Sequence, residues 1–569
     1  MVPPDDLRRL RRRDAPHVGH SVSSTLASFL FDLGVRRSFG ILGGAILPVF
    51  DALQRVGLDP TQFRHEAGAA FAAAEHELAG GGPVAVFTTT GPGLTNALTG
   101  VAAARAEGAR MIVLSGSTAA ARRGRYGFQP TSAEEMANQG LFAGGGWFDY
   151  ATTIESPEML PTVLRRLDEG MRRPHGFVAH VSIPLSVQSA EVGDIQAPPP
   201  IASAPPSASP EIIRLIADVV RDERTVLWLG HGARGAAPQI RRLVSRLPNV
   251  RVMSSARGAG IVPARDGRFL GITGFGGTDD LAEALEQFDP GCTLILGSRL
   301  GEFTSFWDPR LLRGRAVHVD LDSRAFGAAY PHHECLGVSA EIGAFVEQLN
   351  EHFAREVVHT APRRAPRNRP RSPRSEALVR PRFLMAELQR RVLDATDIPI
   401  ASEAGNAFLW ATHCLDFDRP MRHRTSMSFG SMGHFASGVV GTALARNAKA
   451  LAIVGDGSML MNNEISTAVQ LGAKAIWVVL NDARLGLVDD GMQGLGYPGG
   501  TLDFPRCDFA SIARAMGGAG FRVDRETQLP EALDRALASD RPFVIDVMID
   551  PTRPAPFGSR NASIAAQSR

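Results

Sequence analysis

One rhythm recurs in three segments of the chain and constrains the fold more than any other feature. In each segment a short apolar run is followed by a turn of small residues and then by a helix-like stretch. This pattern is typical of parallel α/β units. The runs are residues 84–91, 111–117 and 177–185, then 225–233, 292–300 and 316–322, and finally 451–458, 475–482 and 543–550. We therefore expect an α/β protein with three doubly wound parallel sheets.

Two proline-rich stretches separate these segments. Residues 196–210 are rich in Pro, Ala and Ser, and residues 360–383 are rich in Pro and Arg. The composition of residues 196–210 does not sustain a helix or a central strand. We interpret the arginine run in the second stretch as a solvated linker rather than as a nucleic-acid patch. The sequence thus predicts three domains, with boundaries near 17–190, 207–352 and 379–556.

Bulk properties exclude several classes of protein. The net charge of +2 provides no broad basic surface for nucleic acid. The four cysteines lie far apart without a CxxC pair, which disfavours a disulfide framework and suits a reducing cytoplasm. No apolar run approaches the roughly 20 residues of a membrane span. We expect a cytoplasmic protein whose partners are small molecules, with neither nucleic acid nor membrane among them.

The strongest local motif is Gly455-Asp456-Gly457-Ser458, which directly follows an apolar run. A second apolar run ends at Asp482, 26 positions after Asp456. The carboxyl ends of parallel strands meet at one sheet edge, where open α/β sheets bind ligands. Glycines let the backbone approach a ligand, and carboxylates supply the oxygen ligands that Mg²⁺ shares with phosphates and water. A plain Asp-Gly turn is the alternative, but the second carboxylate favours a site for metal and phosphate.

This motif and its spacing resemble the diphosphate-binding signature of thiamine-diphosphate-dependent enzymes. The resemblance extends over nearly the whole chain and is strongest to the acetolactate synthase (acetohydroxyacid synthase) group. It implies that Asp456 and Asp482 bind Mg²⁺ through their side chains, and Arg484 through its backbone carbonyl. Many members have asparagine where Asp482 stands; aspartate keeps the oxygen ligand and adds a negative charge. The segment 403–406 resembles the loop that contacts the cofactor diphosphate, which assigns Asn406 to that contact.

A second group of matches lies in the first segment. Residues 64–68, RHEAG, followed by TTTGPGLTN at 88–96, resemble the pyrimidine-binding signature of the family. For Glu66 alone, the simpler interpretation is a carboxylate that favours the dipole at a helix start. The resemblance implies instead that Glu66 hydrogen-bonds the aminopyrimidine ring of the cofactor. Proton exchange through the ring then activates the thiazolium carbon, a role for which a buried carboxylate is suited.

The resemblance places further residues near the reacting centre. Gly43 and Gly44 lie in a segment similar to the PGGA loop of the family, with leucine where proline is usual. Gln129, in GFQP, matches a glutamine beside the reacting carbon. Met432, in FGSMGHF, matches a bulky apolar residue that supports the bent cofactor, whereas an isolated methionine would be interpreted as core filling. His434 either lines the pocket or is a satisfied histidine at a helix end.

The middle segment has weaker matches. Residues 274–278, Arg299 and residues 320–322 resemble the stretches that hold FAD in acetolactate synthases. Related enzymes keep the fold but hold ADP or nothing, and glycine-rich turns occur in any α/β domain. The resemblance therefore allows FAD beside thiamine diphosphate and Mg²⁺ without requiring it.

We predict a thiamine-diphosphate-dependent transferase or lyase, specifically a carboligase similar to acetolactate synthase. It would decarboxylate a 2-oxo acid and add the resulting acyl carbanion to a second carbonyl compound, with Glu66, Gln129 and Gly44 in the catalytic set. In this family Glu66 and the GDGS motif approach one cofactor from different subunits. This implies a homodimer or homotetramer.

Three other functions compete with this prediction. The nearest is a simple 2-oxo acid decarboxylase or another thiamine-diphosphate lyase. A nicotinamide-dependent oxidoreductase is disfavoured because no GxGxxG opens a first βα unit. A catalytically dead homologue is disfavoured by the intact Glu66, Asp456 and Asp482. Residues 485–500 lack the tryptophan that acetolactate synthases carry there to favour a larger acceptor, which disfavours a housekeeping role in branched-chain amino-acid synthesis and leaves a specialised carboligase open.

Overall fold

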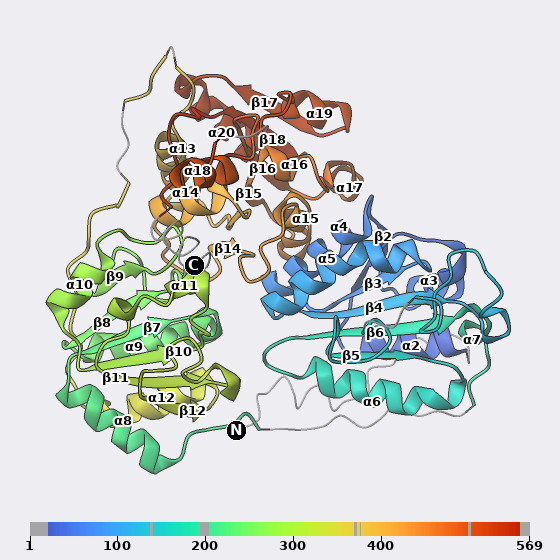
Figure 1. The fold of residues 1–569 in the computed structure, drawn as a ribbon, viewed down its shortest axis with the longest axis horizontal. Helices are drawn as coiled ribbons and strands as arrows, with labels where there is room; N and C mark the ends of the chain where they lie inside the picture. The colour runs from blue at the N-terminus through green and yellow to red at the C-terminus, as the bar shows by residue number, and fades with distance from the viewer. Residues whose placement is uncertain are drawn as a thin grey trace.

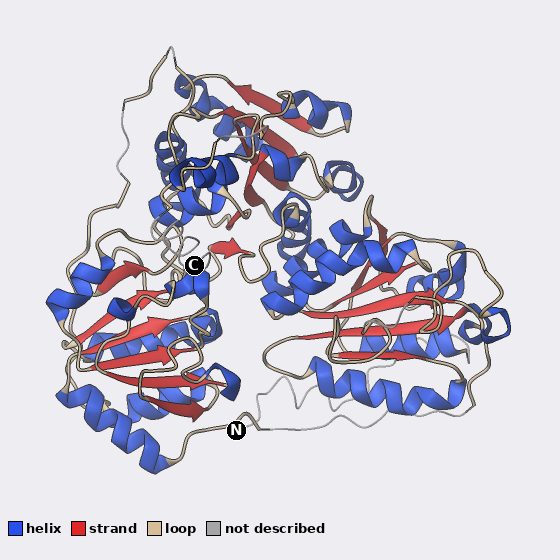
Figure 2. Cartoon of the chain, viewed as in Figure 1, coloured by secondary structure: helices blue, strands red, loops and turns tan. Residues whose placement is uncertain are grey.

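Three parallel sheets make up the framework of the molecule (Figures 1 and 2). The structure is a computed structural model that describes residues 21–136, 140–193, 204–368, 372–375, 377–498 and 502–557. Within these residues each sheet has six strands, and every strand pair between named strands is parallel. Helices flank the sheets (Figure 2). The predicted α/β class with three parallel sheets is confirmed.

The first sheet has the strand order β2-β1-β3-β4-β6-β5. Its inner strand β3 is buried along its whole length because helices cover both faces of the sheet, which explains its unbroken apolar run. The strands are β1 (Arg37–Gly40), β2 (Pro60–Gln62), β3 (Val84–Thr88), β4 (Arg110–Ser117), β5 (Tyr150–Thr153) and β6 (Phe177–Pro184). The helices are α2 (Val22–Asp32), α3 (Leu47–Arg55), α4 (Glu66–His76), α5 (Pro92–Glu107), α6 (Leu160–Met171) and α7 (Leu185–Gln188).

The middle sheet has the order β12-β11-β10-β7-β8-β9. If the six strands are numbered 1 to 6 in chain order and the sheet is read from β9 to β12, the order is 3-2-1-4-5-6. This is the order of dinucleotide-binding sheets. The strands are β7 (Thr225–Leu229), β8 (Val250–Ser254), β9 (Phe269–Ile272), β10 (Cys292–Leu296), β11 (Arg315–Asp320) and β12 (Cys335–Ser339). The helices are α8 (Pro210–Asp222), α9 (Ala237–Arg246), α10 (Leu281–Phe288), α11 (Glu302–Ser305) and α12 (Ile342–His352).

The third sheet has the order β14-β13-β15-β16-β18-β17, which repeats the order of the first sheet. The strands are β13 (Ile400–Ser402), β14 (His423–Thr425), β15 (Ala450–Gly455), β16 (Ala475–Asn481), β17 (Ala519–Val523) and β18 (Phe543–Met548). The helices are α13 (Pro381–Leu388), α14 (Asn406–Cys414), α15 (His434–Arg446), α16 (Asp456–Met459), α17 (Ile465–Leu471), α18 (Gly486–Gly494), α19 (Phe509–Ala515) and α20 (Leu529–Ala538).

Helices α4 and α15 pack against each other and join the first region to the third (Figure 1). Small side chains allow this close approach, because a Cβ atom on Gly441 would lie 1.9 Å from the carbonyl oxygen of Ala72. Every residue of α4 is buried, although the helix contains the charged Glu75. The Ala-rich sequence of α4 is therefore explained by packing on two sides.

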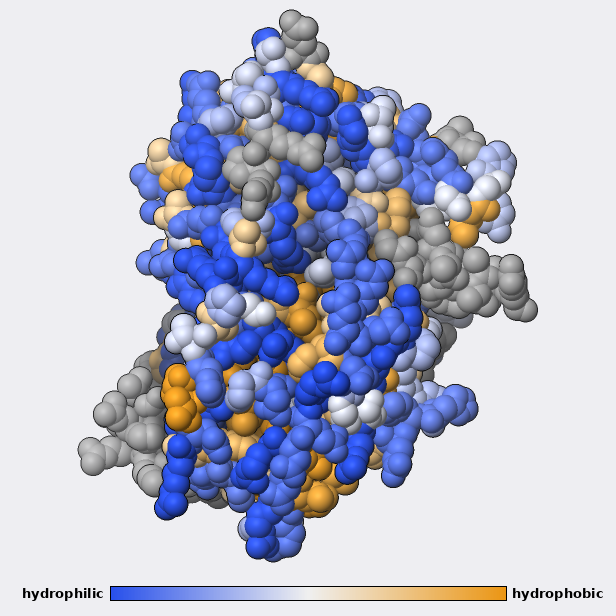
Figure 3. Space-filling view, turned by 90° about the vertical axis from the view of Figure 1, so that its left-hand side faces the viewer, coloured by the Kyte–Doolittle hydropathy of each residue, from blue (hydrophilic) through white to orange (hydrophobic). Residues whose placement is uncertain are grey.

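The predicted domain limits 17–190, 207–352 and 379–556 enclose the three sheets, and we keep them as a proposal. Residues 17–20 and the linker residues 196–203 and 369–371 lie outside the described part. In the second linker, Arg380 pairs with Glu526 at 2.6 Å. One face of the molecule is mostly hydrophilic, with apolar side chains in scattered groups (Figure 3). None of the described helices combines the length and apolarity that a membrane crossing requires.

Candidate functional site

The strand order of the third sheet marks where a ligand should bind. Chain connections leave in opposite directions from β13 and β15, which are neighbours, and open α/β sheets bind ligands outside the carboxyl ends of such a pair. Residues 403–406 follow β13, Asp456 follows β15, and Asp482 follows the next strand, β16. The predicted metal and diphosphate residues therefore share one sheet edge.

Asp456 and the segment after Asp482 are in direct contact. Asp456 is 2% exposed. Its Oδ2 accepts a hydrogen bond from the Ala483 amide at 2.6 Å, and its Oδ1 accepts one from the Gly457 amide at 2.8 Å. Burial, together with the neighbouring Asp482, raises the pKa of Asp456 to about 7. Burial also raises the pKa of Asp482, while Arg484 opposes this effect. Two carboxylates in this setting would be stabilised by a bound cation.

Mg²⁺ suits these two carboxylates. Among the described residues, no three His, Cys, Asp or Glu side chains converge to hold a metal ion. Mg²⁺ does not need such a cluster, because it usually binds one or two carboxylates and completes its shell with phosphate oxygens and water. The predicted ligand set, Asp456, Asp482 and the backbone carbonyl of Arg484, matches that chemistry.

The neighbouring loops leave polar atoms and space for an anion. Asn406 begins α14, and its buried Oδ1 has no hydrogen-bond partner. Cβ atoms added to Gly405 or Gly455 would meet nothing within 4 Å, so the backbone there is open on one side. At Gly457 a Cβ would lie 3.2 Å from the Met432 side chain, so both predicted residues line the same spot. Ser458 is buried in the first turn of α16. A diphosphate fits at such helix starts.

Glu66 lies at the carboxyl edge of the first sheet. It is the first residue of α4 and is 6% exposed. The Asn96 side chain donates to its Oε2 at 3.2 Å. Gly93 faces its Oε1, because a Cβ at that glycine would lie 3.4 Å away. One carboxylate oxygen of Glu66 is therefore held by Asn96, and the other faces Gly93.

Gln129, Gly43 and Gly44 gather around the same edge. Gln129 has a φ of 51°, an unusual conformation for a side chain of its size. Thr90, which follows β3, donates to the side-chain carbonyl of Gln129 at 3.1 Å. Gly43 is tight against Thr89, because its added Cβ would lie 2.4 Å from the Thr89 hydroxyl, whereas Gly44 is exposed. The fold thus collects the predicted residues of the first region into one cluster.

Glu464 links this cluster to the third region, and the sequence prediction did not include it. It is 1% exposed, and it accepts hydrogen bonds from the amides of Arg64 and His65, each at 3.1 Å. Thr467 donates to the same carboxylate. Burial raises the pKa of Glu464 to about 7. The only sequence hint was an acidic residue eight positions after Asp456, ahead of a helix.

His434 has a structural role. It begins α15, is fully buried, and its Nε2 lies 2.9 Å from Glu75 Oε1. Its ring packs against Phe71 and Phe435. His434 thus lies within the contact between α4 and α15, where Nε2 has a partner and the buried Nδ1 has none among the described residues. Of the two interpretations of His434, this position at a helix start favours the histidine at a helix end.

The predicted FAD residues of the middle region contact the protein itself. An added Cβ at Gly274 would lie 2.1 Å from the Phe303 carbonyl oxygen, and one at Gly276 would lie 3.1 Å from Leu409. Arg299 donates to the Ala106 carbonyl at 3.5 Å. At 320–322 the two aspartates bond within the chain, one to a neighbouring amide and the other to an arginine. These contacts account for the motif residues through packing, so they do not single out FAD.

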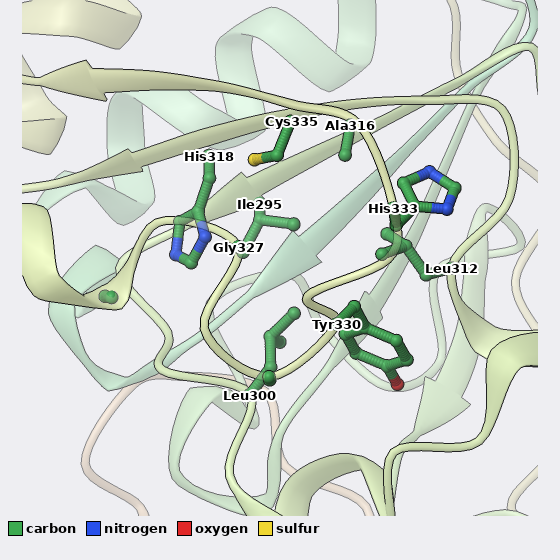
Figure 4. A pocket seen from close by; sticks show the side chains of 11 residues that line it. Ile295, Leu300, Leu312, Ala316, His318, Gly327, Tyr330, His333 and Cys335 are labelled. Carbon is green, nitrogen blue, oxygen red and sulfur yellow. The ribbon is translucent and has the colours of Figure 1, made fainter.

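The middle region also contains a small cavity beneath residues 325–335 (Figure 4). Ile295, Leu300, His318, Tyr330 and Cys335 are among its lining residues. Its volume of about 10 Å³ admits no more than a single water molecule. This cavity is therefore not a cofactor site.

Comparisons with known proteins match all three regions. The family described as "Thiamine pyrophosphate enzyme" matches through its N-terminal TPP binding domain at 20–137, its central domain at 212–349 and its C-terminal TPP binding domain at 403–547. A protein of Mycobacterium tuberculosis assigned as an acetolactate synthase large subunit is 30% identical over 518 residues, covering 86% of this chain and 90% of the relative. The large subunits of Escherichia coli acetolactate synthase isozymes 2 and 1 are both 28% identical, covering 91% and 92% of this chain and 93% of each relative.

Proposed function

The chain belongs to the thiamine pyrophosphate enzyme family, and from this premise we propose that it is a thiamine-diphosphate-dependent carboligase of the acetolactate synthase type. The reaction decarboxylates a 2-oxo acid and joins its acyl carbon to a second carbonyl compound. The observation that carries the proposal is the placement of Asp456 and Asp482 at adjoining strand ends, within the domain that matches the C-terminal TPP binding domain.

Thiamine diphosphate, when bound, supplies the electron sink that decarboxylation and carbon–carbon bond formation require. In our proposal Asp456, Asp482 and the Arg484 carbonyl hold Mg²⁺. Asn406 and the first amides of α14 receive the diphosphate, because a helix start favours an anion. Met432 supports the centre of the cofactor beside Gly457.

The first region supplies the groups that act at the reacting end. Glu66 exchanges a proton with the aminopyrimidine through its Oε1, while Asn96 holds Oε2. Gln129 uses its side-chain NH₂ as a donor to the substrate oxygen, because Thr90 already occupies its carbonyl. Gly44 keeps the adjacent loop free of a side chain.

Three finer points remain proposals. FAD in the middle region rests on the resemblance and on the dinucleotide-type strand order; the visible absorbance of the purified protein tests it. A homodimer or homotetramer is supported by exposed apolar residues near Gln129 and Met432 in sequence and near the GDGS motif, such as Tyr126 at 100%, Phe128 at 92% and Met461 at 53%. A fully active monomer in analytical ultracentrifugation would refute it. A cytoplasmic location also remains a prediction.

The proposed reaction is tested by incubating the holoenzyme with pyruvate and a panel of aldehydes and 2-oxo acids. Mass spectrometry should find products that contain the acetyl unit of pyruvate and the whole of one acceptor. Release of carbon dioxide with acetaldehyde as the sole organic product, whatever acceptor is present, would replace the carboligase with a simple decarboxylase.

A further inference from the structure

Directly after β16, the strand that precedes the proposed metal ligand Asp482, the chain leaves the sheet edge and later returns to it. Two backbone hydrogen bonds join the outgoing and returning segments. The Leu485 amide donates to the Leu502 carbonyl at 3.1 Å, and the Phe504 amide donates to the Ala483 carbonyl at 3.0 Å. Helix α18 lies between these two segments, and we expect the residues of this helix to act in the choice of acceptor. What holds α18 against the metal site therefore matters for the position of the acceptor.

One arginine connects the metal site to this helix. Arg484 lies 3.3 Å from Asp482 Oδ2, 2.6 Å from Asp489 Oδ2 and 3.3 Å from Asp490 Oδ1, and it also donates to the Pro551 carbonyl at 2.9 Å. The arginine and its three partners have side-chain exposures between 9% and 14%. Asp482 is the proposed Mg²⁺ ligand, whereas Asp489 and Asp490 belong to α18.

The backbone between the two charged residues is held in a strained conformation. Ala483 has a φ of 60°, which a residue with a side chain adopts only at a cost. The Asp456 carboxylate accepts its amide at 2.6 Å and stabilises this turn. Asp482 and Arg484 therefore flank Ala483, whose amide is bound by the other proposed metal ligand, Asp456.

Carboxylates crowd around Arg484. Its guanidinium contacts three of them, Asp482, Asp489 and Asp490, and the Asp456 carboxylate accepts the amide of the intervening Ala483. Asp490 Oδ2 is buried without a hydrogen-bond partner. Asp482 is one of these carboxylates, and its Oδ2 accepts a hydrogen bond from Arg484 Nε at 3.3 Å. A divalent cation on Asp456 and Asp482 would relieve the repulsion across the whole group.

We propose that Arg484 is a positioning residue that shares Asp482 with the divalent cation and thereby couples cation binding to the position of α18. This inference rests on the proposed function, since it takes Asp456 and Asp482 as the cation site. Cation binding reduces the electrostatic repulsion between the carboxylates. Because Arg484 contacts Asp482, Asp489 and Asp490, this stabilisation extends to α18. Coupling between two sites is reciprocal, so whatever cation binding adds to the order of α18, an ordered α18 adds to cation affinity by the same factor.

Hydrogen exchange of peptides covering 486–498 measures the order of α18 without any turnover. The full-length protein is compared with and without Mg²⁺ at one fixed concentration of thiamine diphosphate, and Mg²⁺ affinity is measured by calorimetry at that concentration. Arg484→Gln removes the charge, and Arg484→Lys keeps it on a group that cannot span three carboxylates. Arg522→Gln is the matched control, because Arg522 is a partly exposed arginine that pairs with Asp524 at 2.9 Å.

In the parent, Mg²⁺ is expected to slow exchange in α18 by about tenfold, which corresponds to about 1.4 kcal/mol. Arg484→Gln should reduce that slowing to less than about twofold and should weaken Mg²⁺ binding by the factor that is lost. Arg484→Lys should give an intermediate slowing, and Arg522→Gln should match the parent. The lysine variant also keeps the test decisive if the glutamine variant fails to fold.

Two results would overturn the coupling, and they are distinguishable. If Arg484→Gln raises exchange equally with and without Mg²⁺, Arg484 merely anchors the helix, and the proposed function still stands. If the parent shows no Mg²⁺-dependent binding of thiamine diphosphate by calorimetry, the proposed function and the coupling both fall.

Discussion

Two regions of the molecule contain buried carboxylates on whose pKa values the surroundings act in opposite directions. Between α4 and α15, Glu75 meets Arg424 through two hydrogen bonds of 2.6 and 3.0 Å. Burial works to raise its pKa, but Arg424 and His434 hold the pKa of Glu75 at about 2. Around the candidate site, by contrast, burial raises the pKa of Asp456, Glu464 and Glu403 to about 7.

The difference separates a structural pair from a site that is prepared for a ligand. Arg424, on the neighbouring strand β14, supplies the counter-charge to Glu75, so the Glu75 carboxylate remains ionised. Asp456 and Glu464 accept hydrogen bonds from amides but have no ion-pair partner among the described residues. A bound cation would supply the counter-charge for Asp456 at the sheet edge, and the cofactor would lie near Glu464. The following predictions test this contrast.

The largest expected effect concerns Glu66, which acts on the proposed reaction rather than on the fold. Glu66→Gln should slow exchange of the thiazolium C2 proton by about 10²–10⁴-fold, because it removes an acid–base group. Binding of thiamine diphosphate should change by less than about tenfold, since only one hydrogen bond is altered. Quenched-flow deuterium exchange followed by NMR, at saturating cofactor, measures the rate. Equal rates in parent and variant would return Glu66 to the role of a helix-start charge.

Glu75→Gln should act on stability instead. It leaves Arg424 buried beside a neutral partner, with Glu107 as the nearest remaining carboxylate at 3.6 Å. Loss of one partner of a buried pair costs about 3 kcal/mol or more. Urea unfolding of the parent and the variant measures the free energy of unfolding. Glu211→Gln is the control, because Glu211 is an exposed side chain of α8 that pairs with Arg214. A loss below about 1 kcal/mol would mean that the pair between α4 and β14 contributes little to the stability of the fold.

The pH dependence of stability should show the uncompensated charge of Asp456. Its folded pKa of about 7 lies above the value of about 4 for an exposed aspartate. The protonated form therefore contributes stability that is present below about pH 4 and is lost as pH rises through about 7. Without metal, the parent should lose about 2 kcal/mol between pH 5 and pH 8 relative to Asp456→Asn, which cannot ionise. Parallel urea-unfolding profiles for the two proteins would contradict this.

The smallest expected effect concerns the strained turn between Asp482 and Arg484. Ala483→Gly removes the cost of a positive φ at a residue with a side chain, although glycine loses more backbone entropy on folding. The net result should be a gain of about 0.5 kcal/mol in the free energy of unfolding, with Mg²⁺ affinity unchanged. A clear destabilisation would show that the methyl group of Ala483 supports the site.

The sequence predicted the framework better than the contacts between its parts. Strands such as β15 and β16 were foreseen within a few residues, because a strand covered on both faces must be continuously apolar. Short edge strands such as β2 and β14, with three residues each, carry no such pattern.

The candidate site shows the same division between local and long-range information. Local motifs identified Asp456, Asp482 and Glu66, whose surroundings in sequence are distinctive. The contact of Glu464 with Arg64 was missed because the two residues are 400 positions apart, and nothing local encodes which loops the fold brings together. The partner of His434 was missed for the same reason, since Glu75 lies 359 positions away.

The central claim is that Asp456 and Asp482 form the metal site through which thiamine diphosphate is bound. Calorimetric titration of thiamine diphosphate into the parent and into Asp456→Ala, each with and without Mg²⁺, tests it most directly. The parent should bind only when Mg²⁺ is present. Asp456→Ala should remain folded by circular dichroism and lose at least about 100-fold in affinity, because a buried charged ligand of the cation is gone. Undiminished, Mg²⁺-dependent binding in the folded variant would contradict the account.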